Sequence, residues 1–210
     1  MEHIVLLGDS IFDNKSYVGD APDVVSHLRA IMPKDWIATL CAVDGSIAES
    51  VPAQRDRVPQ EATQLVLSVG GNDALRNQDL LYEDLQGNRV LSILADVAEE
   101  FEVNYRNAVQ VLRALGKALC VCTIYNGNLP AEVSRAAKAA VAVFNDRIYS
   151  VANELRLPVI ELRRVCTEAM DYANPIEPSD VGGAKIARRI LEHVQVRVFH
   201  ANGGTERKAP

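Results

Sequence analysis

The sequence predicts an α/β fold in which five parallel strands form a sheet between two layers of helices. Five apolar segments of strand length alternate along the chain with segments whose apolar residues recur at helical spacing. Three of the strand-like segments run directly into turns that contain glycine and Asp or Asn. This alternation is typical of a parallel sheet with helices on both faces, which is a three-layer αβα arrangement.

The first strand is predicted over residues 4–7, where four consecutive apolar residues are typical of a central strand covered on both faces. It stops abruptly at Gly8, and residues 11–19 are expected to form a loop or a short helix. The remaining elements are expected in this order: helix 20–32, strand 36–43, helix 47–57, strand 64–69, helix 92–115, strand 118–125, helix 131–155, strand 158–162 and helix 181–196. Pro33 and Gly116 end two of these helices.

The chain of 210 residues is expected to form one domain over residues 1–198, because no repeat or internal linker divides it. Residues 199–210 are polar, contain glycine and have too little apolar surface to fold, so they are predicted to be a flexible tail.

Composition excludes several function classes. No apolar run approaches the roughly 20 residues that span a bilayer, and the amino terminus lacks an export signal, so a soluble, cytoplasmic protein without a membrane partner is expected. The net charge of −6 without a Lys/Arg cluster argues against nucleic acid as a partner. The four cysteines show neither metal nor disulfide spacing and are expected to be buried thiols.

Three side chains or backbone groups with catalytic potential follow three different strands. They are the hydroxyl of Ser10, the backbone N–H of Gly45 and the side-chain amide of Asn72. Ligands of open α/β sheets collect outside the carboxyl ends of the strands. A serine that attacks a carbonyl needs hydrogen-bond donors aimed at the developing oxyanion. The backbone N–H of Gly45 and the amide of Asn72 are donors of that kind. The pattern therefore predicts a nucleophile and an oxyanion hole.

Each turn also has a simpler interpretation. Asp9 and Ser10 are common helix caps and could cap a helix that begins near Ile11. Residues 70–73 could be a turn with positive φ. A phosphate-binding loop is not favoured, because the chain contains neither Gly-x-Gly-x-x-Gly nor a Walker pattern.

Taken together, the motifs resemble the SGNH (GDSL) hydrolase family over residues 4 to about 196. The residues that carry the resemblance are Gly8-Asp9-Ser10, Gly45, Gly71-Asn72-Asp73 and a Pro/Ser/Gly-rich segment before the last helix. The resemblance implies a flavodoxin-like sheet and cofactor-free, metal-free hydrolysis of esters or thioesters. It also implies Ser10 as nucleophile and an oxyanion hole formed by the N–H groups of Ser10 and Gly45 and the amide of Asn72. Asp9, Gly71 and Asp73 belong to the same motifs and are expected to contact the substrate.

The last motif departs from the family pattern Asp-x-x-His. Asn174 stands where the acid is expected, and Glu177 stands where the base is expected. Glu177 could act as a general base if burial raised its pKa, with the Asn174 amide donating to it. Alternatively, Glu177 could only cap the following helix or interact with its dipole. None of the four histidines is an attractive base: His3, His27, His193 and His200.

The function that these features favour is a serine hydrolase that acts on small esters or acyl groups, including acetylated sugars. The alternative is an acyl- or carbohydrate-binding module on the same fold that has lost its base. Residues 75–90 are predicted to be a loop that forms a pocket lid, because the segment is mixed in charge and comes right after Asn72.

Overall fold

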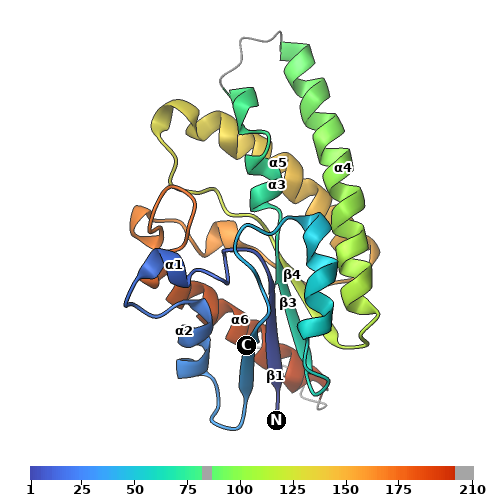
Figure 1. The fold of residues 1–210 in the computed structure, drawn as a ribbon, viewed down its shortest axis with the longest axis vertical. Coiled ribbons are helices and arrows are strands. Elements are labelled where there is room, and N and C mark those ends of the chain that lie inside the picture. The colour runs from blue at the N-terminus through green and yellow to red at the C-terminus, as the bar shows by residue number, and fades with distance from the viewer. Residues whose placement is uncertain (82–86, 202–210) are drawn as a thin grey trace, which may run out of the picture.

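The computed structural model describes residues 1–81 and 87–201, and it contains one sheet of five parallel strands with helices on both faces (Figure 1). The strand order is β2-β1-β3-β4-β5, which confirms the predicted fold class and the flavodoxin-like order. The strands are β1 (His3–Gly8), β2 (Ile37–Leu40), β3 (Gln64–Ser68), β4 (Ala118–Cys122) and β5 (Val159–Ile160).

The helices largely follow the predicted order, with short 3₁₀ elements (η) added. They are α1 (Lys15–Val18), α2 (Val24–Ile31), η1 (Ala48–Arg57), α3 (Gly71–Leu75), η2 (Gln78–Leu81), α4 (Gly87–Arg113), α5 (Ala131–Glu154), η3 (Leu162–Arg164), η4 (Ala169–Asp171) and α6 (Asp180–Ala201). The segment predicted as a helix over 47–57 is a 3₁₀ helix and contains Pro52, which has no N–H to donate within a helix.

Most element boundaries lie within a few residues of the prediction, and two segments predicted to be irregular are partly helical. The predicted loop over 75–90 is largely helical where it is described, because α3 ends at Leu75, η2 covers Gln78–Leu81 and α4 begins at Gly87; residues 82–86 lie outside the described residues. Residues 199–201 of the predicted tail belong to α6, because this helix continues through Ala201; residues 202–210 lie outside the described residues.

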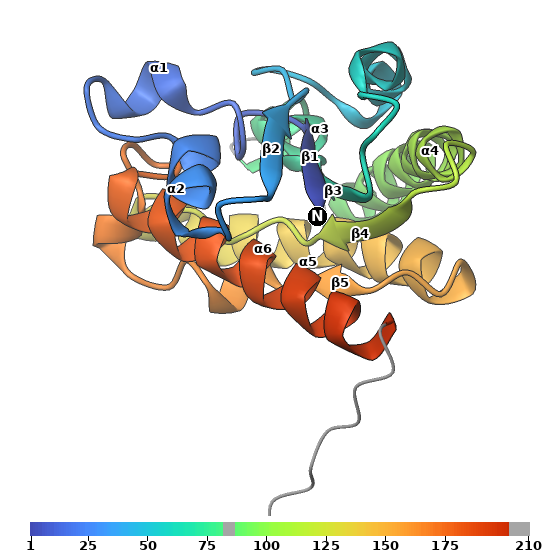
Figure 2. The same cartoon turned by 90° about the horizontal axis from the view of Figure 1, so that it is seen from below.

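The core forms on both faces of the sheet because successive side chains of a strand point to opposite faces. Ile4 and Leu6 of β1 pack with α2 and α6 on one face, whereas Val5 and Leu7 pack with η1, α4 and α5 on the other. Figure 2 shows α2 and α6 on the side of the sheet opposite to α4. These four side chains are fully buried, and burial of each stabilises the fold by about 1.5–3 kcal/mol.

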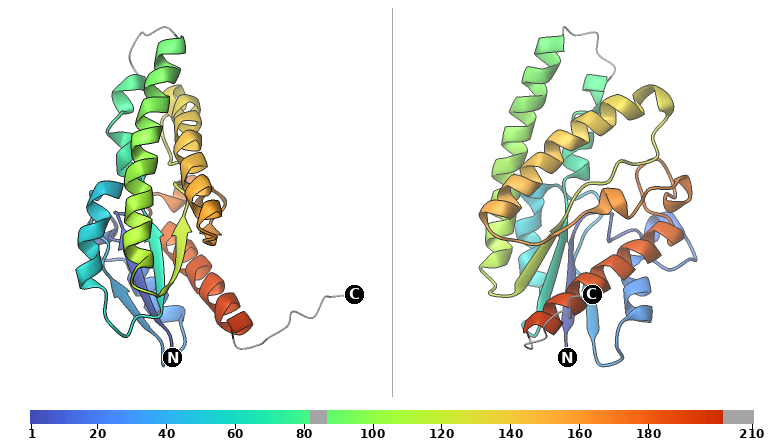
Figure 3. Two further views of the ribbon diagram at one scale, coloured as in Figure 1. Left: turned by 90° about the vertical axis from the view of Figure 1, so that its right-hand side faces the viewer. Right: turned by 180° about the vertical axis from the view of Figure 1, so that it is seen from behind.

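Helices α4 and α5 are longer than the sheet they cover. The 27 residues of α4 span about 40 Å, whereas a five-residue strand such as β3 spans about 17 Å. The carboxyl-terminal parts of both helices pack on the sheet, where the rings of Phe101 and Phe144 lie 5.1 Å apart. Their amino-terminal parts extend past the carboxyl edge of the sheet (Figure 3).

No helix in the described part of the chain is both long enough and apolar enough to cross a membrane. The four cysteines are buried and free, as the sequence predicts: Cys41, Cys120, Cys122 and Cys166.

Candidate active site

Ser10 is presented at the carboxyl edge of the sheet by a turn that requires glycine at position 8. Gly8 has φ +119°, and a Cβ at this position would lie 1.7 Å from the backbone oxygen of Ser68. The turn is fixed to both neighbouring strand ends, because the N–H of Asp9 donates to the Ser68 oxygen at 3.0 Å and the N–H of Val43 donates to the Gly8 oxygen at 3.0 Å. The inner strand β1 therefore ends in a turn that is hydrogen-bonded on both sides.

Neither Asp9 nor Ser10 caps a helix at Ile11. The first helix begins only at Lys15, and Asp9 Oδ1 accepts the N–H of Ile11 at 3.1 Å within the turn itself. Ser10 is only 6% exposed, and its Oγ donates to Oε1 of Glu177 at 3.1 Å. The sequence interpretation of Ser10 as a helix cap is wrong.

Glu177 is held in place by the loop that precedes α6. Asn174 Oδ1 accepts the N–H groups of Ile176 at 2.9 Å and of Glu177 at 2.8 Å. The hydroxyl of Tyr125 donates to the Ile176 oxygen at 2.6 Å. From the sequence, the Asn174 amide is expected to donate to the Glu177 carboxylate. Instead, the side-chain carbonyl oxygen of Asn174 accepts from the loop backbone and holds it in place. An Asx turn of this kind needs the acceptor two or three residues before the donors, and Asn174 has that spacing.

The alternative role of Glu177 as a helix cap is taken by another residue. Ser179 Oγ accepts the N–H of Gly182 at 3.2 Å at the start of α6. The Glu177 side chain turns away from the helix toward Ser10 and is only 5% exposed. Its second oxygen, Oε2, is buried without a hydrogen-bond partner in the described structure.

Two carboxyl groups with raised pKa lie in this site. Burial raises the pKa of Glu177 above its ordinary value, while the hydrogen bond from Ser10 opposes the rise and the negative charge of Asp44 adds to it. Burial raises the pKa of Asp9 to about 8, and the charges of Glu177 and Asp73 add to the effect against the N–H of Ile11. A pKa of about 8 favours the protonated form of Asp9 at neutral pH. Glu177 is the group that accepts the hydrogen bond from Ser10.

The predicted oxyanion donors are brought together only in part. Asn72 lines the same cavity as Ser10, and its Nδ2 donates to the Ser46 oxygen at 3.0 Å. An amide nitrogen carries two hydrogens, so this bond leaves one of them for a ligand. Gly45 has φ +76°, is exposed, and does not line this cavity in the described structure.

Of the three residues expected to contact substrate, two line the cavity and one does not. Asp9 and Gly71 line the cavity with Ser10, whereas Asp73 does not. The carboxylate of Asp73 instead accepts the N–H of Ala48 at 3.1 and 3.3 Å, at the start of η1. This placement gives Asp73 a role in holding the loop after β2.

Sequence reasoning missed Gln54, which connects two of the turns. The N–H of Gly8 donates to Gln54 Oε1 at 2.8 Å, and Gln54 Nε2 donates to the Gly8 oxygen at 2.7 Å and to Ser46 Oγ at 3.2 Å. Gln54 is 4% exposed. Its neighbours Arg55 and Asp56 are charged and exposed, so the local sequence carries no sign of a buried amide.

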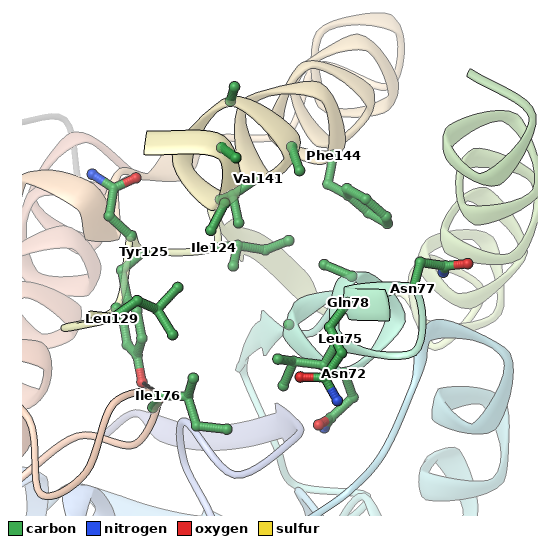
Figure 4. A pocket seen from close by; sticks show the side chains of 18 of the residues that line it. Asn72, Leu75, Asn77, Gln78, Ile124, Tyr125, Leu129, Val141, Phe144 and Ile176 are labelled. Atoms are coloured by element: carbon green, nitrogen blue, oxygen red, sulfur yellow. Dashed lines mark hydrogen bonds between the residues drawn. The ribbon is translucent and has the colours of Figure 1, made fainter. Parts of the chain in front are cut away.

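A cavity of about 400 Å³ opens from Ser10 into the space between the helices that follow β3 and β4. Val141 and Phe144 of α5, Leu75 of α3 and Ile124 after β4 point into it (Figure 4). The described residues that line the cavity include no histidine. Within the described chain no group of three His, Cys, Asp or Glu residues is arranged to hold a metal ion.

The described histidine side chains have other surroundings. His3 Nε2 lies 2.7 Å from Thr39 Oγ1, and His27 Nε2 lies 2.8 Å from Asp180 Oδ1. Burial lowers the pKa of His193, which lies on α6. Ser10 is thus paired with the carboxyl group of Glu177.

The comparison with family models identifies the chain. Residues 6–185 match the GDSL-like lipase/acylhydrolase family, and the chain belongs to this family of hydrolases. A search of curated proteins found no match to the sequence.

Solved structures share the fold at low sequence identity. A lipolytic protein of the G-D-S-L family from Veillonella parvula has a TM-score of 0.69 and 16% identity, covering 91% of this chain and 97% of its own. The lipase Lip_vut3 from a goat rumen metagenome has a TM-score of 0.72 and 16% identity, with 91% and 97% covered. Phospholipase A1 from Streptomyces albidoflavus has a TM-score of 0.69 and 13% identity, with 93% and 98% covered. At these identities the similarity concerns the fold.

Proposed function

We propose that the protein is a serine hydrolase of carboxylic esters in which Ser10 is the nucleophile and Glu177 is the general base. The observation that supports this proposal is the 3.1 Å hydrogen bond from Ser10 Oγ to Glu177 Oε1 at the floor of a cavity. A nucleophile within hydrogen-bond distance of a base, with the base held by further contacts, is the arrangement that covalent catalysis needs. Membership of a lipase/acylhydrolase family agrees with this chemistry.

The reaction has two stages. Ser10 Oγ attacks the ester carbonyl carbon while its proton moves to Glu177 Oε1, and the carbonyl oxygen becomes an oxyanion. The backbone N–H of Ser10 and the free hydrogen of the Asn72 amide stabilise that charge. The carbon–oxygen bond to the alcohol then breaks, and the alcohol leaves with the proton from Glu177. In the second stage water gives a proton to Glu177 and attacks the acyl carbon of the acyl-enzyme. The bond from that carbon to Ser10 Oγ then breaks, Glu177 returns the proton to Oγ, and the acid is released.

A carboxylate is a weaker base than an imidazole. The ordinary pKa values of Glu and His differ by about two units, which makes proton transfer from Ser10 less favourable by about 3 kcal/mol. Burial raises the pKa of Glu177 and recovers part of this difference. We therefore propose that the enzyme is slower than one with a Ser/His/Asp triad. We also propose that it acts in the reducing cytoplasm, where buried free cysteines are common.

One observation favours a second function, an acyl-binding module without turnover. The cavity is lined by no histidine among the described residues, so the usual base of a serine hydrolase is missing there. A binding module would hold an acyl group in the cavity, and Ser10→Ala would change neither its affinity nor the background hydrolysis.

The experiment that separates the two functions is labelling with a fluorophosphonate together with turnover of p-nitrophenyl butyrate between pH 5 and 9. The hydrolase is expected to label and to turn over, and Ser10→Ala is expected to lose both. Ser16→Ala is the matched control, because Ser16 is exposed on the same segment of the chain. Absence of labelling and turnover, with wild type and Ser10→Ala alike, would reject the hydrolase.

A further inference from the structure

The cavity beside Ser10 is built from the parts of α4 and α5 that extend beyond the sheet. Val90, Leu91 and Leu94 of α4 line one side, and Val133 and Val141 of α5 lie among the lining residues of the other. Leu91 is 67% exposed although it lines the cavity, so the cavity reaches the surface beside α4. An exposed leucine at the mouth of a cavity is a favourable place for an apolar ligand to enter.

The face of α5 toward the cavity consists of small and apolar side chains. Apart from Ala139, its lining residues recur at intervals of three and four, which places them on one side of a helix: Val133, Ala136, Ala137, Ala140, Val141 and Phe144. Phe144 is buried and contacts the ring of Phe101, so the aromatic pair closes the inner end of this face. The alanines before it leave the space that larger side chains would fill.

The polar side chains of the cavity include the candidate catalytic groups. Asp9, Ser10, Asn72 and Glu177 line it, and the buried Oε2 of Glu177 has no partner in the described structure. Ser68, Asn77, Gln78 and Asn126 also line it. Most other lining residues are aliphatic or aromatic. A sugar ring placed among them would lose hydrogen bonds to water without replacement, which is unfavourable, whereas a hydrocarbon chain would gain from burial.

We infer that the cavity binds the unbranched acyl chain of a medium-chain ester, with the ester carbonyl at Ser10 and the chain along α5. This inference rests on the proposed function and specifies its substrate. A methylene group occupies about the volume of a water molecule, about 30 Å³, so the cavity of about 400 Å³ has room for roughly 13 carbons. The cavity therefore has room for an acyl part much longer than acetyl.

The test compares p-nitrophenyl acetate, butyrate, hexanoate and octanoate at concentrations below micelle formation. Each buried methylene can raise kcat/KM by about fourfold, and a rise of at least about 50-fold from acetate to octanoate is expected. Ala140→Phe places a ring in the cavity and is expected to reduce octanoate turnover at least about tenfold while acetate turnover changes less than about threefold. Ala142→Phe is the matched control, because Ala142 is exposed on α5 and does not line the cavity.

A binding measurement keeps this inference separate from the catalytic proposal. Calorimetric titration with 1-octanol is expected to show saturable binding to wild type, Ser10→Ala and Ala142→Phe, and weaker binding to Ala140→Phe. If Ala140→Phe does not fold, Ala136→Phe at an exposed lining position replaces it. Hydrolysis that is independent of chain length and unaffected by Ala140→Phe would overturn the acyl-chain inference and leave the hydrolase standing. Binding of 1-octanol without hydrolysis of any ester would instead reject the proposed hydrolase function and support the cavity as a binding site for an acyl chain.

Discussion

The hydroxyl of Ser10 and the carboxylate of Glu177 lie 3.1 Å apart although 167 positions separate them in the chain. The Gly8 turn fixes the serine, and the loop anchored by Asn174 and Tyr125 fixes the glutamate. The two side chains are therefore positioned by independent parts of the fold. Burying a serine hydroxyl and a carboxyl group is unfavourable for folding. The proposed proton transfer between them gives this burial a function.

Gln54 is predicted to support the turn that carries Ser10. Gln54→Leu removes the partner of the Gly8 N–H, whereas the Gly8 oxygen keeps the N–H of Val43 as a donor. A buried group left unpaired costs about 1–3 kcal/mol, so we expect the free energy of unfolding to fall by at least about 1 kcal/mol in urea titrations. Gln60→Leu is the matched control, because Gln60 is exposed. Equal stability of the two variants would show that the Gln54 bonds contribute nothing.

Asp9 is predicted to make stability depend on pH. Its pKa is about 8 in the folded protein and about 3.8 in an unperturbed chain, so between these values the folded state holds a proton that the unfolded state has lost. The contribution of Asp9 to stability is complete below about pH 4 and is lost as pH rises toward 8, at up to about 1.4 kcal/mol per pH unit.

Asp9→Asn is neutral at every pH and should remove this dependence. In urea titrations at pH 5, 6, 7 and 8, the stability of Asp9→Asn relative to wild type should increase with each step. Asp56→Asn makes the same charge change at an exposed position and serves as the control. Curves for Asp9→Asn and wild type that remain parallel over this range would contradict the assignment of a protonated Asp9.

The family pattern can be rebuilt at the matching positions. In the double variant Asn174→Asp with Glu177→His, the aspartate retains an acceptor for the N–H groups of residues 176 and 177, and the imidazole is the stronger base. We expect kcat for p-nitrophenyl butyrate to rise at least about tenfold near pH 7.5. Glu177→His alone should gain less, because it leaves the imidazole without a carboxylate partner. A double variant that folds and is slower than wild type would show that this loop does not deliver a base to Ser10.

Much of the fold follows from local patterns in the sequence. The buried run before Gly8 and the alternation of strands and helices predict the sheet, because hydrophobic periodicity depends only on neighbours in the chain. The pairing of Ser10 with Glu177 was accessible only through motif order, since no local signal relates two residues so far apart. Whether Asn174 acts through its amide or its oxygen depends on the loop geometry, and the Tyr125 hydroxyl holds this loop by donating to the Ile176 oxygen.

Other features lie beyond sequence reasoning. The cavity depends on how far α4 and α5 extend past β3 and β4, and the residues after Leu75 that looked like a loop contribute 3₁₀ and α-helical turns to its wall. The position of Gly45 outside the cavity depends on the path of the loop after β2. The sequence around Gln54 does not distinguish it from an exposed polar residue, because its burial results from tertiary packing.

The kinetics of Glu177→Gln test the central claim most directly. Glutamine keeps the shape of glutamate and can still accept from Ser10, but it cannot take the proton. If Glu177 is the general base, kcat for p-nitrophenyl butyrate should fall at least about 100-fold, with Ser10→Ala showing no further loss when the two changes are combined. Glu99→Gln, an exposed position on α4, controls for the loss of one negative charge and should match wild type. A folded Glu177→Gln variant with wild-type kcat would contradict the account, because Ser10 would then be activated without the carboxylate that lies 3.1 Å from it.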